Sequence, residues 1–225
     1  MVELNGRTIY ICIPTRGQIN MATCQWLTNT LKQPFDGYDF EVNFSKMDPT
    51  DCNRNRMVMA FLADPKNEWL LFVDDDMLPR ENLLTMIRRG KKVISGLTCV
   101  MQEKFPSPLL MKRTVSDGKN CYRMMTVAEI GDINDPLIEV DGVGAGCLLI
   151  HREVLEKIGS PWFLFQKDED GLLEKSEDYY FSDKVTSAGY KLFVDTEVVV
   201  GHLKQTDLVH IATLLYGSKI SKIMP

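Results

Sequence analysis

The stretch Trp69-Leu70-Leu71-Phe72-Val73 is the most strongly apolar strand candidate in the chain, and Asp74-Asp75-Asp76 follows it directly. A short run that is apolar at every position is typical of a strand covered on both faces, as in a parallel sheet. The abrupt change to three carboxylates indicates that the strand ends at Val73. We therefore expect a buried strand that carries an acidic cluster at its carboxyl end.

Strands and helices alternate on both sides of this run. Apolar runs and alternating patterns predict strands at 8–14, 40–44 and 93–98, and helical spacing predicts helices over 19–31, from about 57 and from about 79. This alternating order builds a parallel sheet with helices on its faces. The first hundred residues thus predict an α/β fold with a Rossmann-like, mostly parallel central sheet flanked by helices.

The second half of the chain is less regular. Between 101 and 135 the pattern predicts loops and short antiparallel strands, and the apolar run at 147–150 predicts a strand followed by a helix over 152–158. Ser176 is a plausible N-cap of a helix that ends near Gly189. Closing strands are expected at 192–194 and 198–200, and a terminal amphipathic helix at 208–223.

Composition narrows the class of protein. The chain has 225 residues, 26 Lys and Arg against 31 Asp and Glu, a net charge of −5 and 44% hydrophobic residues. This balance is typical of a globular domain and lacks the clustered basic charge needed to wrap a nucleic-acid duplex. No stretch approaches the roughly 18 apolar residues that a transmembrane helix requires. We expect a cytoplasmic protein, for which the 208–223 helix is either a plain surface helix or a peripheral membrane contact.

The six cysteines are widely separated and include no C-x-x-C pair. This spacing indicates neither a zinc site nor a disulfide framework. We expect reduced cysteines in the core.

Metal binding is one interpretation of the acidic triplet. Adjacent carboxylates at the end of a buried strand repel one another, and a divalent cation would compensate them. Asp74 and Asp76 point to the same side of an extended chain, whereas Asp75 faces away. A polar turn that caps the next helix is the alternative. His202, which follows the apolar stretch 198–201, is equally consistent with a metal ligand and a structural histidine.

The ordered motifs of the chain resemble the GT-A nucleotide-sugar glycosyltransferases, in particular family-2-like members. The acidic triplet after its apolar strand is similar to the D-x-D motif, and further blocks follow in the family's order. These blocks are Val143-Gly144-Ala145-Gly146-Cys147-Leu148-Leu149-Ile150, Pro161-Trp162-Phe163, Ser176-Glu177-Asp178-Tyr179-Tyr180-Phe181, and Gly189-Tyr190 through Val194-Asp195 to Gly201-His202. The likeness runs from about Ile9 to His202.

The resemblance implies a single GT-A domain over residues 1–225, with a nucleotide-binding half at about 1–100 and an acceptor-binding half at about 101–225. Mn²⁺ or Mg²⁺ would be held by Asp74, Asp76 and His202, ligands that suit these ions better than structural zinc. The expected donor-binding residues lie at the strand ends, in the R-N element at 53–56, and in the loop at 141–146, called the glycine loop below because it contains Gly142, Gly144 and Gly146. They are Pro14, Thr15, Arg16, Asn55, Arg56, Asp74, Asp75, Asp141 and Gly144.

The resemblance also implies a catalytic pair at Glu177 and Asp178. In inverting family members the Asp of this E-D motif takes the proton of the acceptor hydroxyl. Carboxylates stabilised by the dipole at a helix N-terminus fit the same two residues. A metal-binding His after the last strand is more typical of retaining families, so the two signals differ about stereochemistry, and we favour inversion.

The predicted activity is metal-dependent transfer of a sugar from a nucleoside-diphosphate donor, UDP- or GDP-linked, to an acceptor hydroxyl. The acceptor classes that fit are a glycan, a lipid-linked carbohydrate, a protein or a modified nucleic-acid base. Two alternatives stay open. One is a nucleotidyltransferase with an acidic metal site, and the other is a catalytically silent module that binds a sugar nucleotide or glycan.

Overall fold

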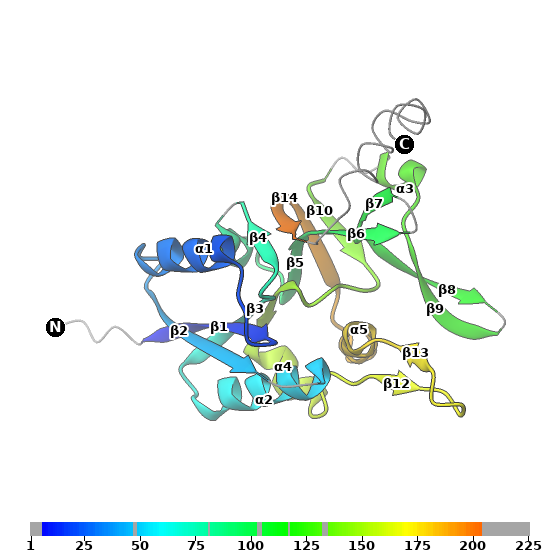
Figure 1. Cartoon of the computed structure of the whole chain (residues 1–225), viewed down its shortest axis with the longest axis horizontal. Helices are drawn as coiled ribbons and strands as arrows, with labels where there is room; N and C mark the ends of the chain where they lie inside the picture. The colour runs from blue at the N-terminus through cyan, green and yellow to red at the C-terminus, as the bar shows by residue number, and fades with distance from the viewer. Residues whose placement is uncertain are drawn as a thin grey trace, which may run out of the picture.

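The computed structural model describes residues 6–46, 49–80, 82–102, 105–116, 118–131 and 135–203. Figure 1 shows the arrangement of the helices and strands within these ranges. In chain order they are β1 (Arg7–Thr15), α1 (Met21–Leu31), β2 (Tyr38–Lys46), α2 (Thr50–Ala63), β3 (Asn67–Val73), β4 (Met77–Pro79), the 3-10 helix η1 (Leu83–Arg89), β5 (Val93–Leu97), β6 (Cys99–Gln102), β7 (Phe105–Pro108), β8 (Met111–Ser116), β9 (Lys119–Met124), α3 (Val127–Gly131), β10 (Leu137–Val140), β11 (Cys147–His151), α4 (Arg152–Ile158), β12 (Gln166–Lys167), β13 (Leu173–Lys175), α5 (Glu177–Ser187) and β14 (Leu192–His202).

One eight-stranded sheet organises the described residues, in the order β10-β14-β5-β11-β3-β1-β2, with β4 paired to β14. The strands β1, β2, β3, β5 and β14 run in one direction, and β4, β10 and β11 run in the other. The sheet takes strands from both halves of the chain. The prediction of an α/β fold with a mostly parallel central sheet flanked by helices is confirmed.

Helices cover both faces of this sheet (Figure 1). Alternate residues of a strand point to opposite faces, and β1 shows this: Ile9, Ile11 and Ile13 join one core cluster, and Tyr10 and Cys12 join the other. The first cluster also contains residues of α1 and η1, and the second contains residues of α2, α4 and α5. Burial on both faces explains why the central strands are apolar at nearly every position.

Some local predictions differ from the structure. Helix α2 begins at Thr50, directly after Pro49 as its N-cap, and not near Met57. The residues after the acidic triplet form β4, because they pair with β14, and only η1 follows, where a longer helix from about Pro79 was expected. The two predicted closing strands are one strand, β14, with an irregularity between Asp195 and Val199. The helix predicted at 208–223 lies outside the described residues.

The cysteines match the prediction only in part. All six are free thiols, as expected, but only Cys12 and Cys147 are buried. Cys52 and Cys99 are exposed, because the first lies in the opening turn of α2 and the second on a hairpin strand. Within the described part of the chain, the helices are all too short or too polar to cross a bilayer.

Candidate functional site

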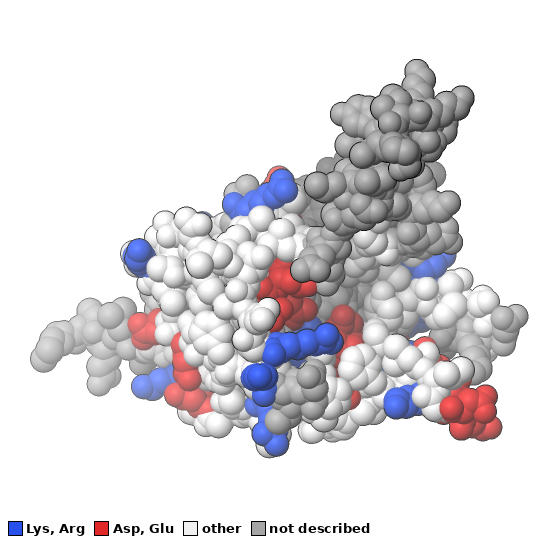
Figure 2. All heavy atoms as spheres, in the orientation of Figure 1, with Lys and Arg blue, Asp and Glu red and all other residues white. Residues whose placement is uncertain are grey.

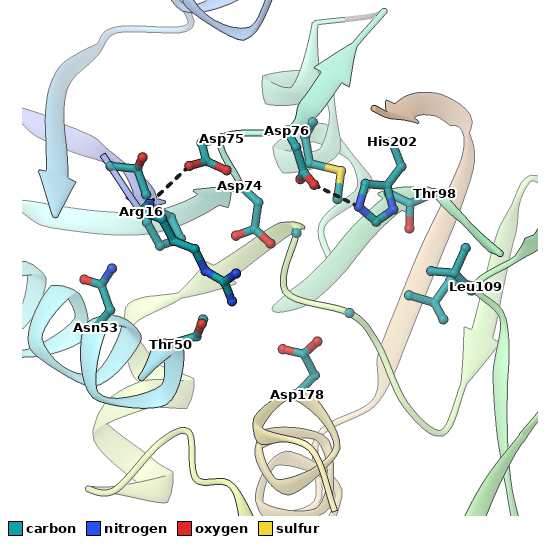
Figure 3. Close-up of a pocket in the computed structure, with 16 residues that line it drawn as sticks. Arg16, Thr50, Asn53, Asp74, Asp75, Asp76, Thr98, Leu109, Asp178 and His202 are labelled. Atoms are coloured by element: carbon teal, nitrogen blue, oxygen red, sulfur yellow. Dashed lines mark hydrogen bonds and ion pairs between the residues drawn. The ribbon is translucent and has the colours of Figure 1, made fainter. Parts of the chain in front are cut away.

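A cavity of about 370 Å³ opens at the carboxyl ends of β1 and β3. These two strands are parallel neighbours, so the segments that follow them meet at one edge of the sheet, where α/β proteins bind ligands. Figure 3 shows the cavity. Its lining comprises Pro14, Thr15, Arg16, Thr50, Asn53, Asp74, Asp75, Asp76, Met77, Thr98, Val100, Leu109, Gly144, Gly146, Asp178 and His202.

The lining is rich in carboxylates. Four aspartates face one arginine, Arg16, whose guanidinium points into the cavity (Figure 3). Figure 2 shows acidic and basic side chains side by side at the centre of this face of the molecule. The neighbouring carboxylates repel one another, so the cavity favours cations. We expect an anionic ligand to enter the cavity together with a cation.

Backbone contacts hold the acidic triplet in place. The Asp74 N–H donates to the carbonyl of Gly146 at 2.9 Å, and the Arg16 N–H donates to Asp75 Oδ2 at 3.3 Å. The Asp75 carbonyl accepts from the Asn20 N–H at 3.0 Å. The first helix, the third strand and the glycine loop therefore meet at the triplet, which fixes where each carboxylate points.

His202, the last residue of β14, lies beside Asp76 in the wall of the cavity. Its Nδ1 lies 3.1 Å from the Cys99 carbonyl oxygen, and its Nε2 lies 3.3 Å from Asp76 Oδ2. A carbonyl oxygen only accepts, so Nδ1 donates to it and Nε2 is left facing the carboxylate. With Nδ1 donating to the carbonyl, Nε2 and the Asp76 carboxylate are placed so that one metal ion could contact both. An imidazole anchored through its other nitrogen to a backbone carbonyl is the usual form of a metal-binding histidine.

Asp74 is committed to a different partner. Arg54 Nη2 lies 3.0 Å from Asp74 Oδ1 and 3.1 Å from Oδ2. Burial raises the pKa of Asp74, although Arg54 opposes the shift. Within the described residues, no three His, Cys, Asp or Glu side chains converge as a complete metal site. The donor set that fits a metal ion is therefore the pair Asp76 and His202. Mg²⁺ is commonly held by one or two carboxylates together with substrate phosphates, so a pair is a reasonable protein contribution.

Asp178 approaches the cavity from the first turn of α5. Burial raises its pKa from 3.8 to about 7, against the opposing effect of Arg54. Its Oδ1 is buried and has no hydrogen-bond partner among the described residues. A carboxylate with a pKa near neutrality and an unpaired acceptor atom can take or give a proton at physiological pH.

Glu177, the residue before it, has a different position. Its side chain is buried behind the cavity, with Oε1 3.8 Å from Arg54 Nε. Burial raises the pKa of Glu177 as well. Glu177 does not line the cavity, so of the predicted catalytic pair only Asp178 faces it.

Two glycines keep the floor of the cavity open. A Cβ at Gly144 would lie 2.6 Å from Leu109 Cδ2, and a Cβ at Gly146 would lie 2.5 Å from Met77 Cε and 3.3 Å from Asp74 Oδ2. The contacts with Leu109 and Met77 are shorter than real Cβ contacts, so a side chain at either position would displace the tip of one of these residues. The loop therefore passes close to the cavity at these glycines.

Nine of the predicted site residues line this cavity: Pro14, Thr15, Arg16, Asp74, Asp75, Asp76, Gly144, Asp178 and His202. Three predicted donor-binding residues do not. Asn55 binds the backbone of Trp162 and Phe163, Arg56 is exposed on α2, and the Asp141 carboxylate accepts from the Arg113 N–H at 2.8 Å. Their polar groups therefore serve the scaffold or face solvent.

The cavity also contains residues that the sequence reasoning missed. They are Thr50, Asn53, Met77, Thr98, Val100, Leu109 and Gly146, and Arg54 lies directly behind them. For Gly146 a signal was available, since it belongs to the glycine loop. For Thr98 there was a signal too, since it ends the strand predicted at 93–98. Val100 and Leu109 come from a segment around the β6–β7 hairpin that has no periodic pattern.

Comparisons with known proteins support the fold. No protein-family model matches the chain, and a search of curated protein sequences gives no match either. Among solved structures, A197 from STIV matches with a TM-score of 0.58 and 20% sequence identity, over 88% of this chain and 86% of that chain. GalNAc-T7, crystallised with UDP, GalNAc and Mn²⁺, matches with a TM-score of 0.50 and 11% identity, over 89% of this chain and 44% of that one. At these identities the similarity establishes a shared fold.

Proposed function

We propose that the protein is a metal-dependent glycosyltransferase that moves a sugar from a nucleoside-diphosphate donor to an acceptor hydroxyl. One observation carries the proposal: the Asp76–His202 pair and the protonatable Asp178 line the same cavity at the carboxyl ends of the strands. The shared fold with GalNAc-T7, which was crystallised with UDP, GalNAc and Mn²⁺, agrees with it. In this proposal residues 1–100 bind the nucleotide and 101–225 form the acceptor side.

The donor side of the cavity, to which β14 adds His202, provides charge and orientation. Asp76 and His202 would hold Mn²⁺ or Mg²⁺, and such an ion offsets the negative charge that develops on a leaving diphosphate. Pro14 and Thr15 end β1 and Arg16 follows it at the same edge, where a base and ribose have room beside them. The Arg16 guanidinium adds a fixed positive charge for phosphate oxygens. Asp75 holds the Arg16 backbone and so orients this segment.

On the acceptor side of the cavity, Asp178 acts as the base. Its ionised carboxylate takes the proton of the acceptor hydroxyl, while the acceptor oxygen forms a bond to the anomeric carbon of the sugar. The bond between that carbon and the phosphate oxygen breaks, and the nucleoside diphosphate leaves with the bonding electrons. A pKa near 7 is well matched to this task at neutral pH. We favour inversion of the anomeric centre, because Asp178 acts in this step as a base and not as a nucleophile.

Product analysis tests the proposal. Wild type, Asp178→Asn and Asp39→Asn are supplied with UDP- and GDP-sugars and Mn²⁺, with water as the minimal acceptor and with candidate glycans. Asp39 is exposed on β2, far from the cavity lining, so Asp39→Asn is the matched control. We expect metal-dependent release of nucleoside diphosphate by wild type and by the control, and its loss in Asp178→Asn.

Two results would contradict sugar transfer. Release of pyrophosphate from nucleoside triphosphates would favour nucleotidyl transfer by the same acidic site. Tight binding of a sugar nucleotide that is then recovered intact, with every acceptor and metal tested, would favour a silent binding module.

A further inference from the structure

Arg54 is a fully enclosed cation directly behind the cavity. The residue is 2% exposed and does not belong to the cavity lining. Its guanidinium lies near the rings of Phe72 and Phe163, 5.2 and 5.9 Å from their centres. An arginine in such apolar surroundings is costly unless its donors are matched by acceptors. The acceptors around the guanidinium therefore determine how much of the cost of burying Arg54 is offset.

These contacts join three segments that are far apart in the sequence. Nη2 donates to both oxygens of Asp74 at the end of β3, and Nη1 donates to the Ala145 carbonyl of the glycine loop at 3.3 Å. Nε lies 3.8 Å from Glu177 Oε1 at the start of α5, an ion pair without a hydrogen bond, and Nε has no hydrogen-bond partner among the described residues. One planar group thus touches the donor-binding strand end, the loop at the cavity floor and the helix that carries Asp178.

Three carboxylates surround this single cation. Burial lowers the pKa of Arg54, but the charges of Asp74, Asp178 and Glu177 together outweigh this effect and raise it. Without it, the three negative groups would repel one another at the junction of β3 and α5, and the two segments would move apart. The guanidinium therefore sets the spacing between the two sides of the cavity.

We infer that Arg54 is the positioning residue of this site, which fixes the base-bearing start of α5 relative to the donor-binding end of β3. The inference rests on the proposed function for its catalytic consequence, while the coupling itself is a property of the fold. A lysine carries the same charge but lacks the planar fork that reaches Asp74, Ala145 and Glu177 together. A lysine at position 54 should therefore stabilise the junction of β3 and α5 without fixing the spacing between these two segments.

The first test measures the coupling without any substrate. Thermal unfolding is recorded for Asp74→Asn, Glu177→Gln and the double variant, in the wild-type and Arg54→Met backgrounds. With Arg54 present, the two shifts in Tm should fail to add by about 2–4 °C or more, because both carboxylates share one partner. In the Arg54→Met background the non-additivity should change by at least as much, because only the direct repulsion between the two carboxylates then couples them. Non-additivity that is the same in both backgrounds would overturn the inference.

The second test separates positioning from simple structural support. Donor KM, kcat and Tm are measured for Arg54→Lys and Arg54→Met, with Arg88→Met as control because Arg88 pairs with Asp36 on the surface. We expect Arg54→Lys to recover most of the Tm lost in Arg54→Met, keep KM within a few-fold, and lower kcat by about 100-fold, the usual cost of a misplaced group.

Recovery of kcat together with Tm in Arg54→Lys would show a structural role only and would refute positioning. The two tests also separate this inference from the proposed function. A wild-type protein that transfers no sugar but shows the non-additive Tm shifts contradicts the function and retains the coupling. A wild-type protein that transfers sugar but shows additive Tm shifts supports the function and contradicts the coupling.

Discussion

Replacing Asp178 by asparagine should stabilise the folded protein progressively as the pH rises. Burial raises the pKa of this carboxyl from 3.8 to about 7 in the folded state. Between these two values the folded protein retains a proton that the unfolded chain has released, so the free energy of unfolding falls as the pH increases. The penalty is complete above about pH 7. Asparagine is neutral throughout and does not incur it.

The size of the effect follows from the shift. Each pKa unit corresponds to about 1.4 kcal/mol, so a change of about three units amounts to roughly 4 kcal/mol over the whole range. Between pH 4.5 and pH 8 wild type should lose about 3 kcal/mol relative to Asp178→Asn. For a chain of this size that difference corresponds to about 6–12 °C in Tm.

The assay is thermal unfolding at pH 4.5, 6 and 8 in EDTA, which removes divalent cations from the acidic cavity. Asp39→Asn serves as the control and should parallel wild type at every pH. The difference in Tm between Asp178→Asn and wild type should increase steadily with pH. Parallel profiles for all three proteins, or a variant that is least stable relative to wild type at pH 8, would refute the argued burial of the charge.

Three further predictions concern the cavity and its support. Asp76→Asn and His202→Gln should each lower Mn²⁺-dependent turnover at least 10-fold while changing Tm in EDTA by only a few degrees, measured by metal titration of activity; turnover that stays near normal would contradict the metal assignment. Gly144→Ala should reduce kcat more than stability, because the new methyl group crowds Leu109 beside the cavity floor; a parallel assay of rate and Tm checks this. Asn55→Ala should cost about 1–3 kcal/mol in urea unfolding, because it leaves backbone groups of the loop before β12 unpaired.

The sequence predicted the sheet well where burial determines the residue pattern. Strands β1 and β3 are covered on both faces, so nearly every residue is apolar and the strands can be recognised one at a time. The position of β11 could not be predicted in this way. It lies antiparallel between β3 and β5, and its apolar run reads the same in either direction and in any place in the sheet.

The spacing of apolar residues in α2 could have distinguished Arg54 from Arg56. Both are cations near the start of a helix, where they oppose its dipole, and of the two only Arg56 was expected to bind the donor. Residues 54, 57, 58 and 61 share one helix face, and the last three are the buried core residues Met57, Val58 and Phe61. This spacing places Arg54 toward the sheet. Its partners at Asp74 and Glu177 come from distant segments, which no local pattern could reveal.

The most direct test of the central claim is calorimetric titration of UDP and of GDP into wild type, Asp76→Asn and Asp39→Asn, each with Mn²⁺ and with EDTA. We predict that at least one nucleotide binds wild type and Asp39→Asn with Mn²⁺, and that EDTA or Asp76→Asn weakens this binding at least 10-fold. Binding that is equally tight in EDTA and in Asp76→Asn, or no binding of either nucleotide under any condition, would contradict a metal-dependent nucleotide site in this cavity.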